Sequence, residues 1–432
     1  MTGQYNLFLS KRLVTEEKIF DGGVLVNEFG KIEDVFDRYD ADNLIAESKD
    51  KINVIDGGDC PLLAGVVDSH VHVNEPGRTA WEGFRTATSA AAAGGITTIV
   101  DMPLNSIPPT TTLENLRIKA NSAKENVYVD VGFWGGVIVG NQDSLRDLVK
   151  AGVVGFKCFL CPSGVEEFPN VGIEDLNLAF DALEGTGSVL AFHAEVEEET
   201  TSGKCMKLAF EFMLFTCHQR MWCRCLVKAR EARLAKGHDA WRGGVTAETC
   251  HHYLTLSADE VPRGHSEYKC APPIRDADNK EKLWKFLLED KLDMVVSDHS
   301  PCTPELKCSD NLKAWGGISS VQFGLSLFWT QASARGLDLR SITKYLSSGP
   351  AHLCGLQNRK GALKKGLDAD LIFFDGDADF IVTKDIIRHK NKAIQSAGSD
   401  SSAPQASPNA EEAPKPSKGI NPRLKRTVKK LT

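Results

Sequence analysis

Short apolar runs alternate with longer helix-like stretches from about Leu62 to Asp298. Such alternation is typical of repeated βα units wrapped around a parallel sheet. Polar and chemically active residues gather at the carboxyl ends of the runs, as in a (β/α)8 barrel whose active site lies on that face. The pattern therefore predicts an α/β fold with a TIM-like barrel. Its strands are expected at 63–73, 97–102, 127–132, 153–159, 189–194, 245–251 and 293–298.

This set is one strand short of the eight that a TIM-like barrel needs. The deficit falls within 196–243, where the stretch 217–225 carries Arg220 and Arg224 in place of an apolar run. Charge on an inner barrel strand is costly, because the interior cannot solvate it. We therefore expect one barrel strand to be disrupted, in an aberrant segment over 196–243.

The segments on either side of the barrel pattern predict a second, smaller unit. Residues 6–56 have the pattern of short strands separated by glycines, and 360–375 resume it, so together they indicate a small β-sandwich domain. After His389 the composition shifts to Ser, Ala, Pro, Glu and Lys, which cannot bury enough apolar surface to offset the entropy of ordering. The expected division is a β segment at 1–60, the barrel at 61–357, a second β segment at 358–391 and a disordered tail at 392–432.

Composition and charge narrow the range of partners. The 432 residues carry a formal net charge of -7, so the folded part has no overall attraction for nucleic acid or anionic lipid. No apolar run approaches the roughly 20 residues that span a bilayer. The 12 cysteines follow no regular framework and the first residues lack a secretory signal, which favours a cytoplasmic compartment and leaves peroxisomal and mitochondrial locations open. A small molecule is the expected partner.

The first barrel strand ends in a motif that carries chemistry, Asp-Ser-His-Val-His at 68–72. Because alternate residues on a strand point the same way, His70 and His72 face one site. Two neutral imidazoles presented together suit a borderline-soft divalent cation such as zinc. An isolated His-X-His pair more often occurs by chance on the surface or in the core, without binding a metal. Here, however, a turn at 74–79 follows the carboxyl end of the strand. That position favours a metal site.

Three further strand ends carry candidate ligands. Lys157 stands where an apolar residue is expected, and burial favours its neutral amine, which can react with carbon dioxide to give an anionic carbamate bridge. The plainer alternative is a snorkelling lysine. His193 suits a second metal, and Asp298 suits a ligand that also shuttles a proton, although a satisfied core histidine and a helix N-cap aspartate are the simpler interpretations. His251 and His252 are interpreted as packing or outer residues.

Together these residues resemble the cyclic amidohydrolases, the superfamily branch that contains dihydroorotase, dihydropyrimidinase and hydantoinase, and within it the allantoinases. The resemblance covers about 66–195 and 244–392, and it rests on the segments 68–79, 81–84, 101–105, 248–254, 269–275 and 315–318. Asn74 stands where a dihydroorotase-like sequence has arginine. An amide there suits a neutral ureido-hydantoin, whereas arginine suits a carboxylate.

The resemblance implies a hydrolase, commonly tetrameric, that opens the ring of allantoin to allantoate. Two zinc ions would be bridged by carboxylated Lys157 and by hydroxide, and Asp298 would carry the proton to the leaving ring nitrogen. The implied metal ligands all lie at strand ends: His70, His72, Lys157, His193 and Asp298. The implied substrate-binding residues are Asn74, Ala271 and Gly317.

One ligand of the implied set is missing. The family has a further zinc-binding histidine on the strand after His193, inside an apolar run that this chain lacks. His218 is the nearest candidate, and Cys223 or Cys225 can also bind zinc. The similarity stops abruptly here and again after Lys392, which is typical of altered splicing or a faulty gene model. Two other functions therefore stay open, a cyclic amidase of the hydantoinase or dihydropyrimidinase type and a non-catalytic scaffold.

Overall fold

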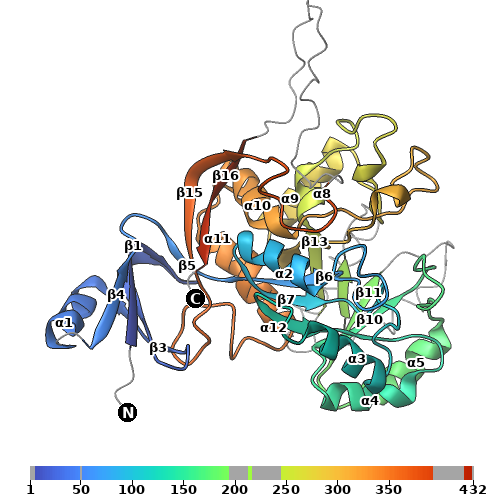
Figure 1. The fold of residues 1–432 in the computed structure, drawn as a ribbon, viewed down its shortest axis with the longest axis horizontal. Coiled ribbons are helices and arrows are strands. Elements are labelled where there is room, and N and C mark those ends of the chain that lie inside the picture. Colours follow the sequence, from blue (N-terminus) through green and yellow to red (C-terminus); the bar gives the residue numbers. More distant parts are fainter. Residues whose placement is uncertain (1–4, 49–50, 194–212, 217–244, 393–422, 431–432) are drawn as a thin grey trace, which may run out of the picture.

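The computed structural model describes residues 5–48, 51–193, 213–216, 245–392 and 423–430. Parallel strands form its centre, in two sheets of order β6-β7-β8 and β14-β13-β12-β11-β10-β9. Only Trp134 separates β8 from β9, and a parallel bridge from Val71 to His299 links the outer edges of the two sheets. With β8 and β9 taken as one strand, the described residues supply the eight strands of a TIM-like barrel (Figure 1).

Most of the barrel strands are buried along their length, because a barrel strand is covered on both faces. They are β6 (Val66–Val71), β7 (Ile96–Asp101), β8 (Asp130–Phe133), β9 (Gly135–Gly136), β10 (Gly155–Phe159), β11 (Val189–His193), β12 (Met213–Thr216), β13 (Thr246–Cys250) and β14 (Met294–Val296). All six residues of β7 are buried, for example. This pattern is why the sequence predicted most of these strands.

Helices around the barrel return the chain from one strand to the next. They are α2 (Phe84–Ala93), α3 (Leu113–Ala123), α4 (Gln142–Lys150), α5 (Ile173–Leu183), α8 (His251–Thr255), α9 (Ala277–Leu288), α10 (Gly324–Ser333), α11 (Arg340–Ile342) and α12 (Gly349–Leu353). Side-chain caps begin two of them, since Thr112 accepts from the amide of Asn115 and Asp276 accepts from the amide of Asn279. Trp284 of α9 stacks on Phe328 of α10 in the main core.

The position expected to lack a strand holds β12. Its backbone pairs in parallel with β11 on one side, where Ala191 faces Leu214, and with β13 on the other, where Phe215 faces Ala247. The sequence analysis missed this strand because its apolar run is only four residues long and stands next to the charged stretch 217–225. The candidate ligands His218, Cys223 and Cys225 lie outside the described residues.

The predicted first barrel strand, 63–73, is divided between two sheets. β5 (Leu62–Ala64) pairs with β1 and β15 of the smaller sheet, and β6 begins the barrel. Gly65 separates them, and a Cβ placed there would lie 2.3 Å from the side chain of Thr97. The chain therefore switches sheets at a residue that has no room for a side chain.

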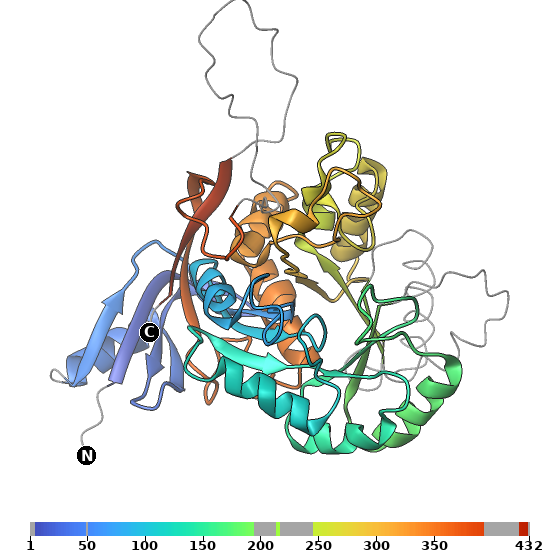
Figure 2. The ribbon, with the colours of Figure 1, turned by 45° about the vertical axis from the view of Figure 1, so that its right-hand side comes forward.

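The smaller sheet joins both ends of the chain, in the order β16-β15-β5-β1-β2-β3 with β4 pairing with β1. Its other strands are β1 (Tyr5–Val14), β2 (Ile19–Val26), β3 (Ile32–Asp37), β4 (Ile52–Asp56), β15 (Leu371–Ile381) and β16 (Arg423–Lys430). Figures 1 and 2 show β1 to β4 on one side of the barrel, with β15 between them and the barrel helices. The sequence predicted such a second β unit beside the barrel.

Two features of this unit differ from the expectation. A helix, α1 (Arg38–Ser48), follows β3 where only short strands were expected. β16 lies inside the stretch expected to be a disordered tail, and its backbone pairs antiparallel with β15, with Phe373 opposite Lys429. The edge of β15 supplies hydrogen-bond partners for the main chain of β16, which this basic segment would lack on its own.

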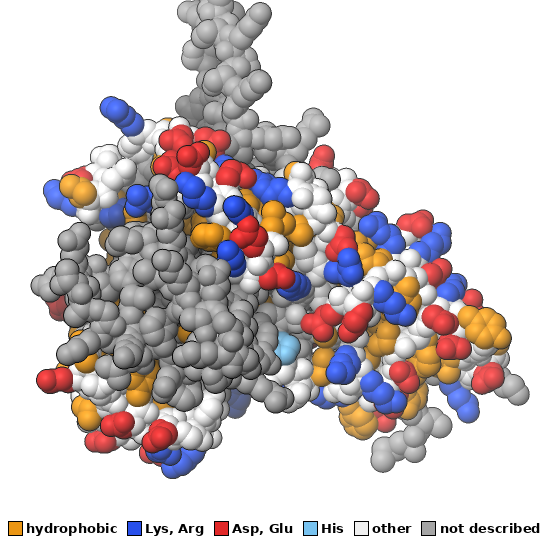
Figure 3. Space-filling view, turned by 180° about the vertical axis from the view of Figure 1, so that it is seen from behind, with side chains coloured by type: hydrophobic (Ala, Val, Ile, Leu, Met, Phe, Trp, Pro, Cys, Tyr) orange, Lys and Arg blue, Asp and Glu red, His pale blue; other side chains and the backbone are white. Residues whose placement is uncertain are grey.

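On the face opposite to that of Figure 1, the described surface does not favour one sign of charge. Acidic and basic side chains are interspersed over its described part (Figure 3). Among the described residues, none of the helices combines the length and the hydropathy that crossing a bilayer requires.

A buried ion pair fixes α3 against the carboxyl end of β7. Lys119 Nζ lies 2.8 Å from Asp101 Oδ2, both side chains are at most 1% exposed, and Asp101 also accepts a hydrogen bond from the amide of Val73. Changing Lys119 to Met should lower the free energy of unfolding by about 3–5 kcal/mol, because it leaves a buried carboxylate unpaired. Urea unfolding followed by tryptophan fluorescence measures this loss. The exposed Lys124, changed to Met, is the control and should shift stability by less than about 0.5 kcal/mol.

Candidate metal centre and active site

His70, His72 and Asp298 form a buried group at the carboxyl end of the barrel. The Nε2 atoms of both histidines lie 3.3 Å from Asp298 Oδ1. One ligand atom from each of the three residues lies within 4.8 Å of the others, which suits a single cation. The alternation at the end of β6 brings the two imidazoles to one side, and the loop after β14, where His299 is bridged to Val71, delivers the carboxylate.

The backbone at Asp298 is held in an uncommon conformation. Its φ is 44°, in the left-handed region that residues other than glycine rarely adopt. Although burial raises the pKa of Asp298, the charges and hydrogen bonds of His70 and His72 outweigh this effect and hold that pKa well below its usual range. The carboxylate is therefore ionised and aimed at the two imidazoles, at a conformational cost that the surrounding structure must sustain.

Glu248 orients His70 and was not singled out by the sequence analysis. Its Oε1 lies 2.6 Å from His70 Nδ1, and its side chain is 1% exposed. A carboxylate on Nδ1 fixes the ring so that Nε2 presents its lone pair to a metal. Glu248 belongs to the segment 248–254, whose resemblance was noted, but nothing local in that segment indicates the distant histidine that it contacts.

Removing the negative charge of Glu248 should weaken metal binding. We expect Glu248→Gln to raise the dissociation constant for Zn²⁺ about 10- to 100-fold, the usual effect of losing a carboxylate that supports a histidine ligand. Competition with a chromogenic chelator measures the change. The exposed Glu289 provides a matched Glu→Gln control, and equal affinities in the two variants would contradict the assigned role.

Lys157 and His193 lie on neighbouring strands, β10 and β11, beside the same pocket. Lys157 is 2% exposed, and it forms no ion pair with the described carboxylates. Burial lowers the pKa of its amine, even though Glu248 and Asp298 oppose that shift. His193 stacks on Phe159 with ring centroids 4.7 Å apart. A buried lysine without an ion-pair partner is the setting in which a neutral amine is available for carboxylation.

A second group of possible ligands adjoins the first. Cys250, His252 and Asp298 also bring one ligand atom each within 4.8 Å of the others. Burial lowers the pKa of His252 to about 4 and that of His251 to about 3, so both imidazoles are neutral near pH 7. Neither ring nitrogen of His252 has a hydrogen-bond partner among the described residues. From the sequence, a packing or outer role was expected for His252, and no role was expected for Cys250.

One pocket contains most of the predicted site. Its lining residues that the sequence predicted are His70, His72, Lys157, His193, Ala271, Asp298 and Gly317. The sequence analysis assigned no role to the other lining residues, which are Leu104, Asn105, Phe159, Ser163, Cys270, Ser300, Trp315 and Gly316. Several come from loops that follow different strands, so that no single segment indicates them.

Asn74 is not among the lining residues of this pocket. It is 1% exposed, its φ is 65°, and its side-chain Nδ2 donates to the carbonyl of Pro301 at 3.2 Å. The amide nitrogen is thereby committed to holding the loop after Asp298. This position differs from the substrate contact expected from the sequence, because the turn after β6 directs the side chain toward the β14 loop.

Comparison with known proteins identifies the class. Residues 62–402 match the amidohydrolase family. The fold is similar to that of L-hydantoinase (dihydropyrimidinase) from Arthrobacter aurescens, with a TM-score of 0.80 and 26% identity over 92% of both chains. The chain belongs to the amidohydrolase family.

Within that family the sequence is similar to proteins named allantoinase. It is 50% identical over 334 residues to the mitochondrial allantoinase of Aquarana catesbeiana, covering 72% of this chain and 69% of that one. It is 42% identical over 362 residues to the allantoinase of Saccharomyces cerevisiae, covering 77% and 78% of the two chains.

Proposed function

We propose that this chain hydrolyses the ring amide of allantoin to give allantoate. Water adds across the C–N bond, so that its oxygen joins the carbonyl carbon and a proton passes to the ring nitrogen. The observation that carries this proposal is the buried group of His70, His72 and Asp298 in the pocket of a chain similar to allantoinases.

The residues of the pocket fit a pair of zinc ions. Imidazole and carboxylate are zinc ligands, and all the proposed donors line one pocket. We assign His70, His72, Asp298 and carboxylated Lys157 to the first ion. Lys157 and His193 serve the second. When bound, such a pair makes water a nucleophile near neutral pH and polarises a carbonyl.

The chain's own residues supply proton transfer and orientation. Asp298 is ionised and faces the reacting region, so it accepts the proton of the attacking water and delivers it to the ring nitrogen. Main-chain groups near Ala271 and Gly317 line the pocket and hold the hydantoin ring. Trp315 lines the same pocket and packs edge-on against Trp81, with centroids 4.8 Å apart, which provides an apolar wall for the ring.

The segment 196–243 decides whether the second metal site is complete. We infer that 196–243 departs from the family pattern and that a replacement sixth ligand would come from His218, Cys223 or Cys225. Without such a replacement ligand, only Lys157 and His193 would hold the second zinc, and the chain would act as a scaffold.

We further propose the domain division at 61–357 and 358–391, a homotetramer and a cytoplasmic location.

A hydantoinase activity is the second candidate, favoured by the structural similarity to the Arthrobacter enzyme. Both substrates contain the hydantoin ring, and they differ in the group attached to it. Comparing kcat/KM for allantoin and for hydantoin with a simple alkyl substituent separates the two functions. A preference for the alkyl compound would reject the first.

The decisive experiment measures zinc and activity on one sample. The full chain is purified, zinc per subunit is determined by elemental analysis, and allantoate formation is followed with added zinc and bicarbonate. About two zinc ions with turnover would support a complete centre. One zinc or none without turnover would reject allantoin hydrolysis for this chain and favour the scaffold.

A further inference from the structure

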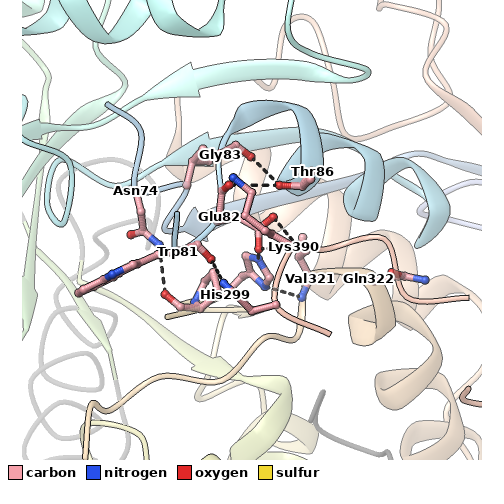
Figure 4. Close-up of polar contacts among 12 residues, drawn as sticks. Asn74, Trp81, Glu82, Gly83, Thr86, His299, Val321, Gln322 and Lys390 are labelled. Atoms are coloured by element: carbon pink, nitrogen blue, oxygen red, sulfur yellow. Dashed lines mark hydrogen bonds and ion pairs between the residues drawn. The ribbon is translucent and has the colours of Figure 1, made fainter. Parts of the chain in front are cut away.

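Glu82 and His299 form a buried contact that the proposed chemistry does not use. Both side chains are 0% exposed, and His299 Nε2 lies 3.4 Å from Glu82 Oε2. Neither residue lines the pocket. Figure 4 shows the two side chains facing each other, with Glu82 on the loop before α2 and His299 on the loop after β14. Burying a carboxylate is costly, so the pair calls for an explanation.

The hydrogen bonds of His299 determine which of its nitrogens carries the proton. Nδ1 accepts from the amide of Ser320 at 3.2 Å and from the amide of Val321 at 3.4 Å. An accepting Nδ1 leaves the proton on Nε2, the atom that faces Glu82. The N–H at Nε2 therefore lies beside the carboxylate of Glu82, at the 3.4 Å ion-pair distance.

The backbone of His299 is linked to two members of the metal group, His72 and Asp298. Its carbonyl accepts a hydrogen bond from the amide of His72 at 2.8 Å. It directly follows Asp298, whose φ of 44° is rarely adopted and persists only where neighbouring contacts enforce it. A fixed His299 ring therefore determines where the backbone presents Asp298 relative to His72.

Glu82 in turn depends on the segment 386–391. The amide of Lys390 donates to Glu82 Oε1 at 3.1 Å, and Asn391 Nδ2 donates to the carbonyl of Trp81 at 2.6 Å. Gln322 holds the start of the same segment, since its Nε2 donates to the carbonyl of Ile386 at 2.7 Å. Both carboxylate oxygens of Glu82 thus face donors, Lys390 on one side and His299 on the other (Figure 4).

We propose that Glu82 and His299 are a positioning pair that sets the geometry of Asp298 and His72 in the metal centre. The inference rests on the proposed function, because it takes His70, His72 and Asp298 as metal ligands. It also gives a role to the segment 81–84, whose resemblance to allantoinases was evident but unexplained. The segment 386–391 completes the arrangement by supplying the second donor to Glu82.

Glutamine cannot replace Glu82 without loss. The carbonyl oxygen of the glutamine amide can face either the amide N–H of Lys390 or the Nε2–H of His299. Its NH2 group then faces the other N–H, and two donors cannot form a hydrogen bond. The imidazole cannot change tautomer to relieve this conflict, because its Nδ1 must accept from Ser320 and Val321. Glu82→Gln therefore removes the charge and one contact while preserving the side-chain volume.

The test compares Glu82→Gln with Asp293→Asn in the full chain. Asp293 is a buried carboxylate at the opposite end of β14, where it accepts a hydrogen bond from the amide of Ala247. It therefore controls for a general loss of barrel stability. In the metal-free proteins, hydrogen exchange should accelerate at 70–74 and 297–301 in Glu82→Gln alone. The dissociation constant for Co²⁺, measured by its visible absorption, should rise about 10-fold or more in that variant only.

The two readouts separate the possible failures. Equal exchange at 70–74 and 297–301 in the two variants would overturn the positioning role, whether or not the chain binds Co²⁺. An unmodified chain that binds no Co²⁺ would instead reject the metal centre of the proposed function, and the exchange data would still decide the role of Glu82. Faster exchange and weaker Co²⁺ binding confined to Glu82→Gln support the proposal.

Discussion

Replacing Asp298 with asparagine is expected to lower kcat for allantoin by at least about 10³-fold. Positioned proton transfer is worth about 10²- to 10⁴-fold, and Asp298 is also a proposed metal ligand, so both contributions are lost or weakened. Asparagine keeps the volume and one oxygen but cannot accept the proton. Initial rates of allantoate formation, measured with zinc content on the same preparation, give the result.

The control for this variant is Asp143→Asn, an exposed change in the first turn of α4. It should leave both kcat and zinc content unchanged. A variant at Asp298 that retains more than a tenth of the normal kcat would show that another group moves the proton. Normal zinc content with lost activity would assign the main effect to proton transfer, and low zinc content would assign it to ligation.

Replacing Lys157 with methionine should remove activity by about 10³-fold or more while the barrel stays folded. Methionine fills a similar volume but cannot form a carbamate, so the proposed bridge between the two ions is lost. Folding should survive because Lys157 lacks an ion-pair partner among the described carboxylates, and burial already disfavours its charged form. Thermal unfolding, zinc content and allantoate formation together test this expectation.

Lys150 provides the matched lysine, since its side chain is 76% exposed at the end of α4. Lys150→Met should match the unmodified chain in zinc content and rate. If Lys157→Met binds as much zinc as the unmodified chain, carboxylation of Lys157 is not what holds the metals. Dependence of the unmodified chain on added bicarbonate, absent from Lys157→Met, would support the carbamate directly.

Local periodicity predicts the candidate ligands on the barrel strands. His70 and His72 alternate with Val71 at the end of β6, and His193 and Asp298 each follow an apolar run, whereas Lys157 lies inside one. The structure places all five around one pocket. Their distances from one another could not be read from the sequence, because barrel geometry sets them.

The same reasoning failed where a signal was short or non-local. β12 is only four residues long, and β16 takes its main-chain partners from a strand about fifty residues earlier in the chain. Asn74, which the sequence predicts to contact the substrate, donates its side-chain Nδ2 to the loop beyond Asp298. In each case a distant segment makes the environment of the residue.

By itself, the sequence predicted the type of barrel, a second β unit and a set of candidate site residues, because burial periodicity and strand alternation are local properties of the chain. Only the tertiary structure decided which distant groups support those residues. Glu248 meets His70 across 178 positions, and Glu82 meets His299 from another loop. A buried polar group needs a partner, but its own sequence neighbourhood does not specify which residue the fold will bring to it.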